Sequence, residues 1–133
     1  MKLLKLFTAF ALIFVFSTAA VAQRKNSGVY LFAVSSSLTD SVVSVSSIQH
    51  LDTVSLTKDK ILPYTPNYSM QFRNYLEVVN DRVDQVVAVF YSKTEKKVKK
   101  DRVKIIKRYQ KKMKAKVEDI PSTDFVFSPV IPE

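Results

Sequence analysis

The run VYLFAV at Val29–Val34 is apolar at every position and rich in residues that favour β-strands. A second run of the same kind, VVAVFY, occupies Val86–Tyr91. A strand that is apolar at consecutive positions is typical of a sheet interior covered on both faces, because successive side chains point to opposite faces. We therefore expect two strands buried on both faces, with other elements packed against them.

Weaker strand patterns lie on either side of these two runs. Val42–Ile48 (VVSVSSI) alternates apolar residues with serines, as a half-buried strand near a sheet edge does. Thr53–Leu56 shows a shorter alternation and predicts a third short strand. Beyond the second apolar run, Ala115–Ile120 and Phe125–Phe127 predict two late strands separated by Pro121.

Two segments have helical rather than strand periodicity. Over Tyr68–Asn80 the apolar residues fall at i, i+4, i+7, i+8 and i+11, which is one stripe of an α-helix, and Ser69 is a candidate N-cap. Thr94–Lys114 predicts a second helix with Thr94 as N-cap. Its expected buried stripe, with Arg102 inside it, consists of Val98, Ile105, Ile106, Tyr109 and Met113.

This order of elements predicts an α+β domain. We expect a two-layer sandwich, in which a mixed sheet of four or five strands packs against two helices. No internal repeat or linker divides the chain, so residues 23–133 are expected to form a single domain. The chain contains no cysteine, so the apolar core must stabilise this domain without disulfides.

Residues 1–22 have the three parts of a secretory signal peptide. Lys2 and Lys5 precede the apolar stretch Leu6–Phe16, and Ala20-Val21-Ala22 supplies small residues at a cleavage site. The alternative is a membrane anchor, but the apolar stretch is shorter than the roughly 20 residues that span a bilayer. We expect cleavage before Gln23, an exported (periplasmic or secreted) protein and no transmembrane segment after processing.

Catalytic signatures are scarce. The single glycine, Gly28, rules out glycine-rich phosphate-binding loops. The only histidine is His50, and a small hydrolase could use it together with Asp40 and Asp52. A zinc site needs three or four ligands, often including cysteine, so we read His50 as a polar residue at the end of a strand. No metal, no cofactor and no catalytic residue is predicted.

The positive charge is concentrated in the second helix. Lys93–Lys116 contains 13 basic residues and two acidic ones, a net charge of +11, whereas the rest of residues 23–133 has a net charge of −4. At 100° per residue, most of these basic side chains fall on one face, opposite the apolar stripe. The residues expected to bind an anion are Lys97, Lys100, Lys104, Lys107 and Lys111. Such a face can also serve solubility alone.

Several short motifs resemble a family of small secreted proteins of Bacteroidota that has no assigned function. The motifs are Val29-Tyr30, Thr39–Val43, Tyr68-Ser69-x-Gln71, Asn74–Leu76, a lysine-rich helix ending near Tyr109, and Asp124-Phe125-x-Phe127. The chain departs from the family where an aromatic residue is expected after Val45 and an arginine before Tyr68. The resemblance implies export and a compact α+β domain without catalytic residues. It also suggests that Asp40 and Gln71 are structural hydrogen-bonding anchors.

Three functional hypotheses follow. The first is a non-enzymatic exported interaction domain whose lysine face binds an anionic partner, such as a lipid head group, a polysaccharide or an acidic protein. The second is the small hydrolase that uses Asp40, His50 and Asp52. The third is a subunit whose exposed strand pairs with another chain. Specific nucleic-acid recognition is not expected, because no aromatic residue on the lysine face could stack on bases. The sequence leaves the oligomeric state open.

Overall fold

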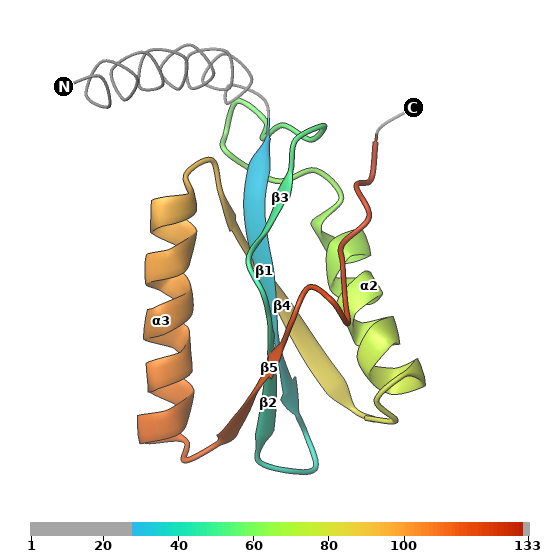
Figure 1. Ribbon diagram of the computed structural model, residues 1–133, viewed down its shortest axis with the longest axis vertical. Coiled ribbons are helices and arrows are strands. Elements are labelled where there is room, and N and C mark those ends of the chain that lie inside the picture. Colours follow the sequence, from blue (N-terminus) through green and yellow to red (C-terminus); the bar gives the residue numbers. More distant parts are fainter. Residues whose placement is uncertain (1–27, 132–133) are drawn as a thin grey trace, which may run out of the picture.

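The computed structural model describes residues 28–131 (Figure 1). The predicted signal peptide and its cleavage site lie outside these residues. The elements, in chain order, are β1 (Val29–Ser37), β2 (Val42–Ser46), β3 (Gln49–Leu51), α2 (Thr65–Val78), β4 (Gln85–Ser92), α3 (Glu95–Lys112) and β5 (Lys116–Ile120). Within residues 28–131, five strands in one mixed sheet and two helices confirm the predicted α+β class.

β1 is the central strand of the sheet. One of its sides pairs with β4 along its length, from Tyr30↔Ser92 to Ser37↔Gln85. The other side pairs with β3 near the start of β1 and with β2 near its end, both antiparallel. β5 then lies parallel to β2 and forms the far edge. The chain thus places the most apolar strand, VYLFAV, where it has neighbours on both sides.

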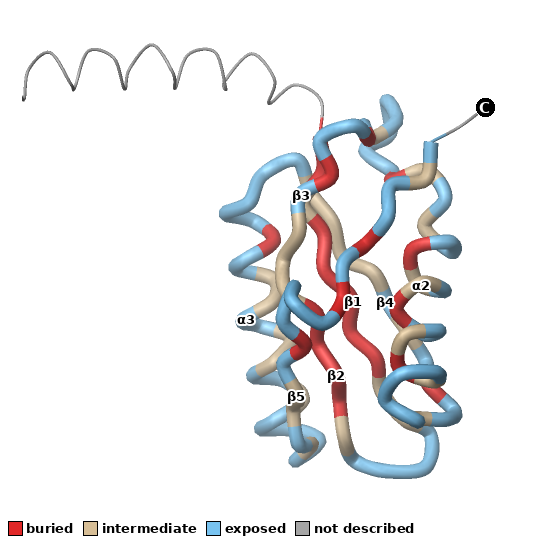
Figure 2. Tube along the Cα trace, turned by 45° about the vertical axis from the view of Figure 1, so that its right-hand side comes forward, coloured by how far each residue is buried: buried red, intermediate tan, exposed pale blue. Residues whose placement is uncertain are grey.

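The two helices cover opposite faces of the sheet, so the fold has three layers (Figure 1). Val29, Leu31 and Ala33 of β1 pack in a cluster with α2, while Phe32 and Val34 pack in a second cluster with α3. The expectation of a two-layer sandwich was wrong in this respect. Side chains of alternate β1 residues pack into the two separate clusters on opposite faces of the sheet. This explains why the strand is apolar at every position. Figure 2 shows buried positions along β1 and in both helices.

The strands differ from the predictions in extent and in burial, and the predicted strand Val42–Ile48 ends at Ser46. Thr53–Leu56 is not a strand; the short strand lies earlier, at Gln49–Leu51, and Val54 is buried from a loop. Phe125–Phe127 is not a strand either, although both phenylalanines are buried. The run Val86–Tyr91 is a strand, but β4 is an edge strand and Val86 is 52% exposed, so it is not buried on both faces.

The residues that flank both ends of α2 include backbone conformations that usually favour glycine. α2 begins at Thr65, after Tyr64 in the left-handed region (φ 59°), and Ser69 lies inside the helix rather than at its N-cap. The helix ends at Val78; beyond it, Asp81 has φ 53° and the Arg82 N–H donates to the Leu76 carbonyl. Thr94 is the N-cap residue of α3, as predicted, but its side chain forms no capping hydrogen bond.

The C-terminal segment closes the face of the sheet that carries α2. The side-chain amide of Gln49 donates to the Phe125 carbonyl (2.9 Å) and accepts from the Phe127 N–H (2.7 Å). Gln71 of α2 makes the same two-way contact with Ser128, at 2.9 and 2.8 Å. Side-chain amides therefore take the place of a neighbouring strand, and the suggested anchoring role of Gln71 is confirmed.

Candidate functional site

A β-bulge separates β2 from β3 and positions the contact between α3 and the sheet. Between the pairs Val34↔Val45 and Leu31↔Gln49, β1 contributes two residues and the opposite chain contributes three, Ser46–Ile48. The Ala33 N–H, which would otherwise bond across the ladder, donates to the Ser46 hydroxyl (2.8 Å). The extra residue leaves backbone groups of this segment without partners on β1.

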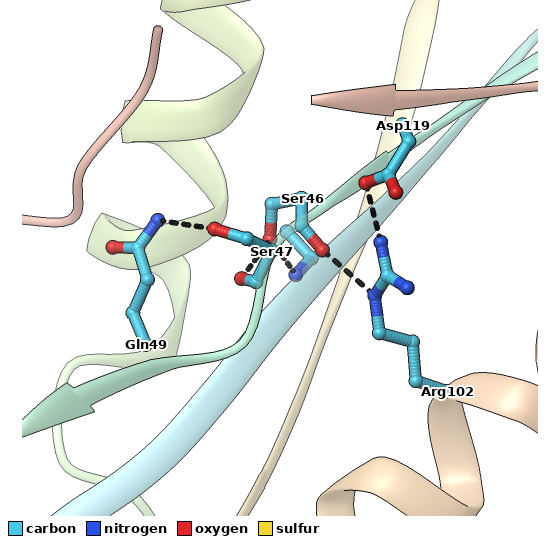
Figure 3. A network of polar contacts seen from close by, with 6 residues as sticks. Ser46, Ser47, Gln49, Arg102 and Asp119 are labelled. Atoms are coloured by element: carbon cyan, nitrogen blue, oxygen red, sulfur yellow. Dashed lines mark hydrogen bonds and ion pairs between the residues drawn. The ribbon is translucent and has the colours of Figure 1, made fainter. Parts of the chain in front are cut away.

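Arg102 of α3 provides a hydrogen-bond donor for a backbone carbonyl of the bulge (Figure 3). Its Nε donates to the Ser46 carbonyl at 3.0 Å, and its Nη2 contacts Oδ1 of Asp119 on β5 at 2.6 Å. The Arg102 side chain is only 18% exposed. The sequence shows that Arg102 lies inside the apolar stripe of the helix. Its two partners, the Ser46 carbonyl of the bulge and Asp119 of β5, follow only from the tertiary structure. The guanidinium thus ties α3 to both β2 and β5.

Arg102→Met should lower the free energy of unfolding by about 1–2 kcal/mol. The methionine keeps the apolar stem but leaves the Ser46 carbonyl without its donor. Arg73→Met is the matched control, because Arg73 pairs with Glu77 on the exposed side of α2 and such pairs contribute about 0.3–0.5 kcal/mol. Urea unfolding of both variants measures the difference. Equal small losses would show that Arg102 is not a structural anchor.

An open hollow of about 430 Å³ lies beside this network. Its lining includes the Arg102 and Asp119 side chains and the bulge residues Ser47 and Ile48. The guanidinium is already bonded to a carboxylate and to a carbonyl, so its charge is largely compensated. The hollow therefore offers a weaker attraction for an anion than the exposed lysines of the same helix.

The five lysines predicted to bind an anion form one row on the outer face of α3. Their spacing of 3, 4, 3 and 4 residues keeps them within an arc of about 80° on the helix. All five are exposed, and Val98, on the opposite side of the helix, is fully buried against β1 and β2. We call Lys97, Lys100, Lys104, Lys107 and Lys111 the lysine row. Of the predicted buried stripe, only Val98 is fully buried. Ile105, Ile106 and Tyr109 are half-buried against the same cluster, and Met113 is 63% exposed near the end of the helix.

None of the five lysines of the row forms an ion pair with a carboxylate of residues 28–131. Within this range, the only ion pair of an α3 lysine joins Lys99 to Glu95 at 3.0 Å. Lys99 lies on the flank of the helix, outside the row. The other α3 ion pair is that of Arg102 with Asp119, on the side facing the sheet. The row is therefore a continuous exposed band of positive charge.

The three residues of the alternative hydrolase are not brought together. His50 pairs with Tyr30 near the start of β1, whereas Asp40 lies in the turn beyond the other end of this nine-residue strand. At about 3.3 Å per residue, more than 20 Å separates them. Asp40 instead accepts a hydrogen bond from the Val42 N–H (2.9 Å), which confirms its suggested role as a turn anchor.

His50 has a structural environment of its own. Its ring stacks on Tyr30 with a centroid distance of 4.4 Å. It also covers Gly28, where φ is +130° and a Cβ atom would lie 2.6 Å from His50 Nε2. The single glycine is thus required by this packing. Among residues 28–131, no three His, Asp or Glu side chains are grouped so that they could hold a metal ion.

Neither helix of the described part of the chain is long and apolar enough to cross a membrane. The sequence matches no protein-family model, no curated protein and no solved structure in the comparisons with known proteins.

Proposed function

We propose that this protein is an exported, non-enzymatic interaction domain that binds a linear or planar polyanion through the lysine row of α3. Export is expected from the signal-peptide pattern of residues 1–22 and from the resemblance to secreted proteins of Bacteroidota. The single observation that carries the binding proposal is the row itself: five exposed lysines on one helix face with no carboxylate partner among the described residues.

The shape of the row favours an extended anion over a small one. From Lys97 to Lys111 the helix rises about 21 Å, so the lysines follow one another at about 5 Å intervals. A small anion would contact one or two of them, whereas a sulfated polysaccharide or an anionic bilayer surface presents charges along the entire row. Like charges at i, i+4 within the row repel each other, and an extended anion would relieve this repulsion.

Binding to heparin, a linear sulfated polysaccharide, tests the proposal. We expect binding at low salt that is largely lost at about 0.5 M salt, because surface charges are screened over a Debye length of about 8 Å at physiological ionic strength and less above it. If five lysines each neutralise one charge, the slope of log K against log salt should be about −3.5, taking the coefficient of a single-stranded polyanion. Isothermal titration at several salt concentrations measures this slope.

Two results would contradict the proposal. Absence of binding to both heparin and anionic vesicles at low salt would show that the row serves solubility alone. Binding that does not change with salt would place the interaction in a shaped pocket elsewhere. A parallel titration with vesicles containing anionic lipid distinguishes a bilayer surface from a linear polymer.

A further inference from the structure

The outer edge of β4 is an unprotected strand edge. β4 pairs with β1 on one side, and no other described strand pairs with it. Its eight residues, QVVAVFYS, include no charged residue and no proline. Monomeric proteins normally protect such edges with charges, proline, bulges or a covering segment, because unpaired backbone groups recruit other strands. A run as apolar as VVAVFY is also typical of segments that assemble through strand pairing.

Apolar side chains extend this edge into a surface. Val86 is 52% exposed and Ala88 is exposed, both on the side of the sheet that carries α3. On the side that carries α2, an open groove of about 380 Å³ lies beside the strand, between Met70 and Arg73 of the helix and Val87 of β4. An added strand would therefore meet apolar surface on both faces as well as free backbone groups.

The charges at the two ends of β4 indicate which strand fits. Asp81 and Asp84 precede the strand, and Lys93 follows it. In an antiparallel pair of two β4 strands, the acidic end of each strand lies beside the basic end of the other. A parallel arrangement would instead place like charges together. We propose that β4 pairs antiparallel with the β4 strand of a second copy, which gives a dimer with one continuous sheet.

This dimer has a consequence for the lysine row. A two-fold axis perpendicular to the sheet keeps each face on its own side, so the two α3 helices lie on the same face of the continuous sheet. Their lysine rows then point the same way and form one doubled cationic surface. This step rests on the proposed function, whereas the dimer itself does not. A polyanion long enough to contact both rows would favour the dimer by bridging them.

Sedimentation of the protein without any polyanion tests the dimer. In 0.5 M salt, where repulsion between the α3 helices is screened, we expect a concentration-dependent shift toward twice the monomer mass. Val86→Lys should abolish the shift, because a charged lysine on an exposed strand edge opposes pairing with another strand. Val103→Lys is the matched control, since Val103 is also 52% exposed but lies on α3, and it should leave the dimer intact.

A second measurement uses the absence of cysteine from the chain. Ala88→Cys places a thiol near the expected two-fold axis, so a short bismaleimide should give a crosslinked dimer in high yield, whereas Val103→Cys should give little. A purely monomeric wild-type protein at high concentration, or equal crosslinking of the two variants, would overturn the proposal. Substitution of the lysine row should leave the dimer unchanged in 0.5 M salt, so failure of the dimer and failure of polyanion binding are distinguishable.

Discussion

Replacing Lys100, Lys104, Lys107 and Lys111 with glutamine is expected to weaken heparin binding at low salt by about three orders of magnitude. A lysine near an anionic surface contributes about 1 kcal/mol, so four of them contribute about 4 kcal/mol if their effects add. The four side chains are exposed and have no ion-pair partner among residues 28–131. Titration of the variant and the wild type with heparin at low salt measures the ratio of dissociation constants.

The same variant should remain folded. Lysine and glutamine have similar helix propensities, and none of the four positions contributes to the buried clusters of the sheet. The substitution also removes the like-charge pairs Lys100–Lys104 and Lys107–Lys111, each of which destabilises the helix by about 0.2–0.5 kcal/mol. We therefore expect a free energy of unfolding equal to that of the wild type or slightly higher. A large loss of stability would mean that the lysine row is part of the architecture.

A pair of double variants separates the row from the net charge of the protein. Lys104→Gln with Lys107→Gln and Lys58→Gln with Lys60→Gln remove the same two charges. Lys58 and Lys60 are exposed in the connection between β3 and α2. The first double variant should weaken heparin binding by about 2 kcal/mol, and the second should change it little. Equal effects of the two would show that binding follows overall charge, without a defined surface.

Apolar periodicity predicted the parts of the fold that depend on one segment at a time. β1 and α2 follow directly from the runs and stripes of the sequence, and the alternation within β1 explains both cores. The short strand β3 was missed because its register depends on the bulge at Ser46–Ile48, which exists only relative to β1. β4 was expected to be buried on both faces, since composition alone does not distinguish an apolar edge strand from a central one.

In the candidate site, too, the features that depend on a single helix could be predicted from the sequence, and those that depend on long-range contacts could not. The lysine row follows from residue spacing on a single helix, and the structure places all five side chains on its exposed face. The role of Arg102 required knowledge of the bulge and of β5, which are 56 and 17 residues away in the chain. Gln49 illustrates the limit most clearly, because its two hydrogen bonds bring it to a segment 76–78 residues later. Such contacts leave no local pattern in the sequence.

The C-terminal segment shows why apolar alternation there predicted a strand. Phe125 and Phe127 point into the core on the α2 side, as alternate residues of a strand would. Their rings pack edge to face at 4.8 Å, and Phe127 also contacts the ring of Tyr68 edge to face at 6.1 Å. The Val130 N–H donates to the Tyr68 hydroxyl at 2.9 Å. Phe125 and Phe127 are thus buried while Val126 between them is exposed, as in a strand. The side chains of Gln49, Gln71 and Tyr68, rather than a neighbouring strand, bond the backbone of this segment.

Phe127→Ala should therefore lower the free energy of unfolding by about 3–5 kcal/mol, the usual cost of truncating a buried phenylalanine. Phe127 is 2% exposed, and its loss would leave a cavity beside Tyr68 and Phe125. Val126→Ala is the matched control, because Val126 is adjacent in the chain but 63% exposed, and it should cost less than about 0.5 kcal/mol. Urea unfolding of the two variants measures both changes. If Phe127→Ala lowered the free energy of unfolding as little as Val126→Ala does, the C-terminal segment would contribute little to stability, and the core on the α2 side would be complete without it.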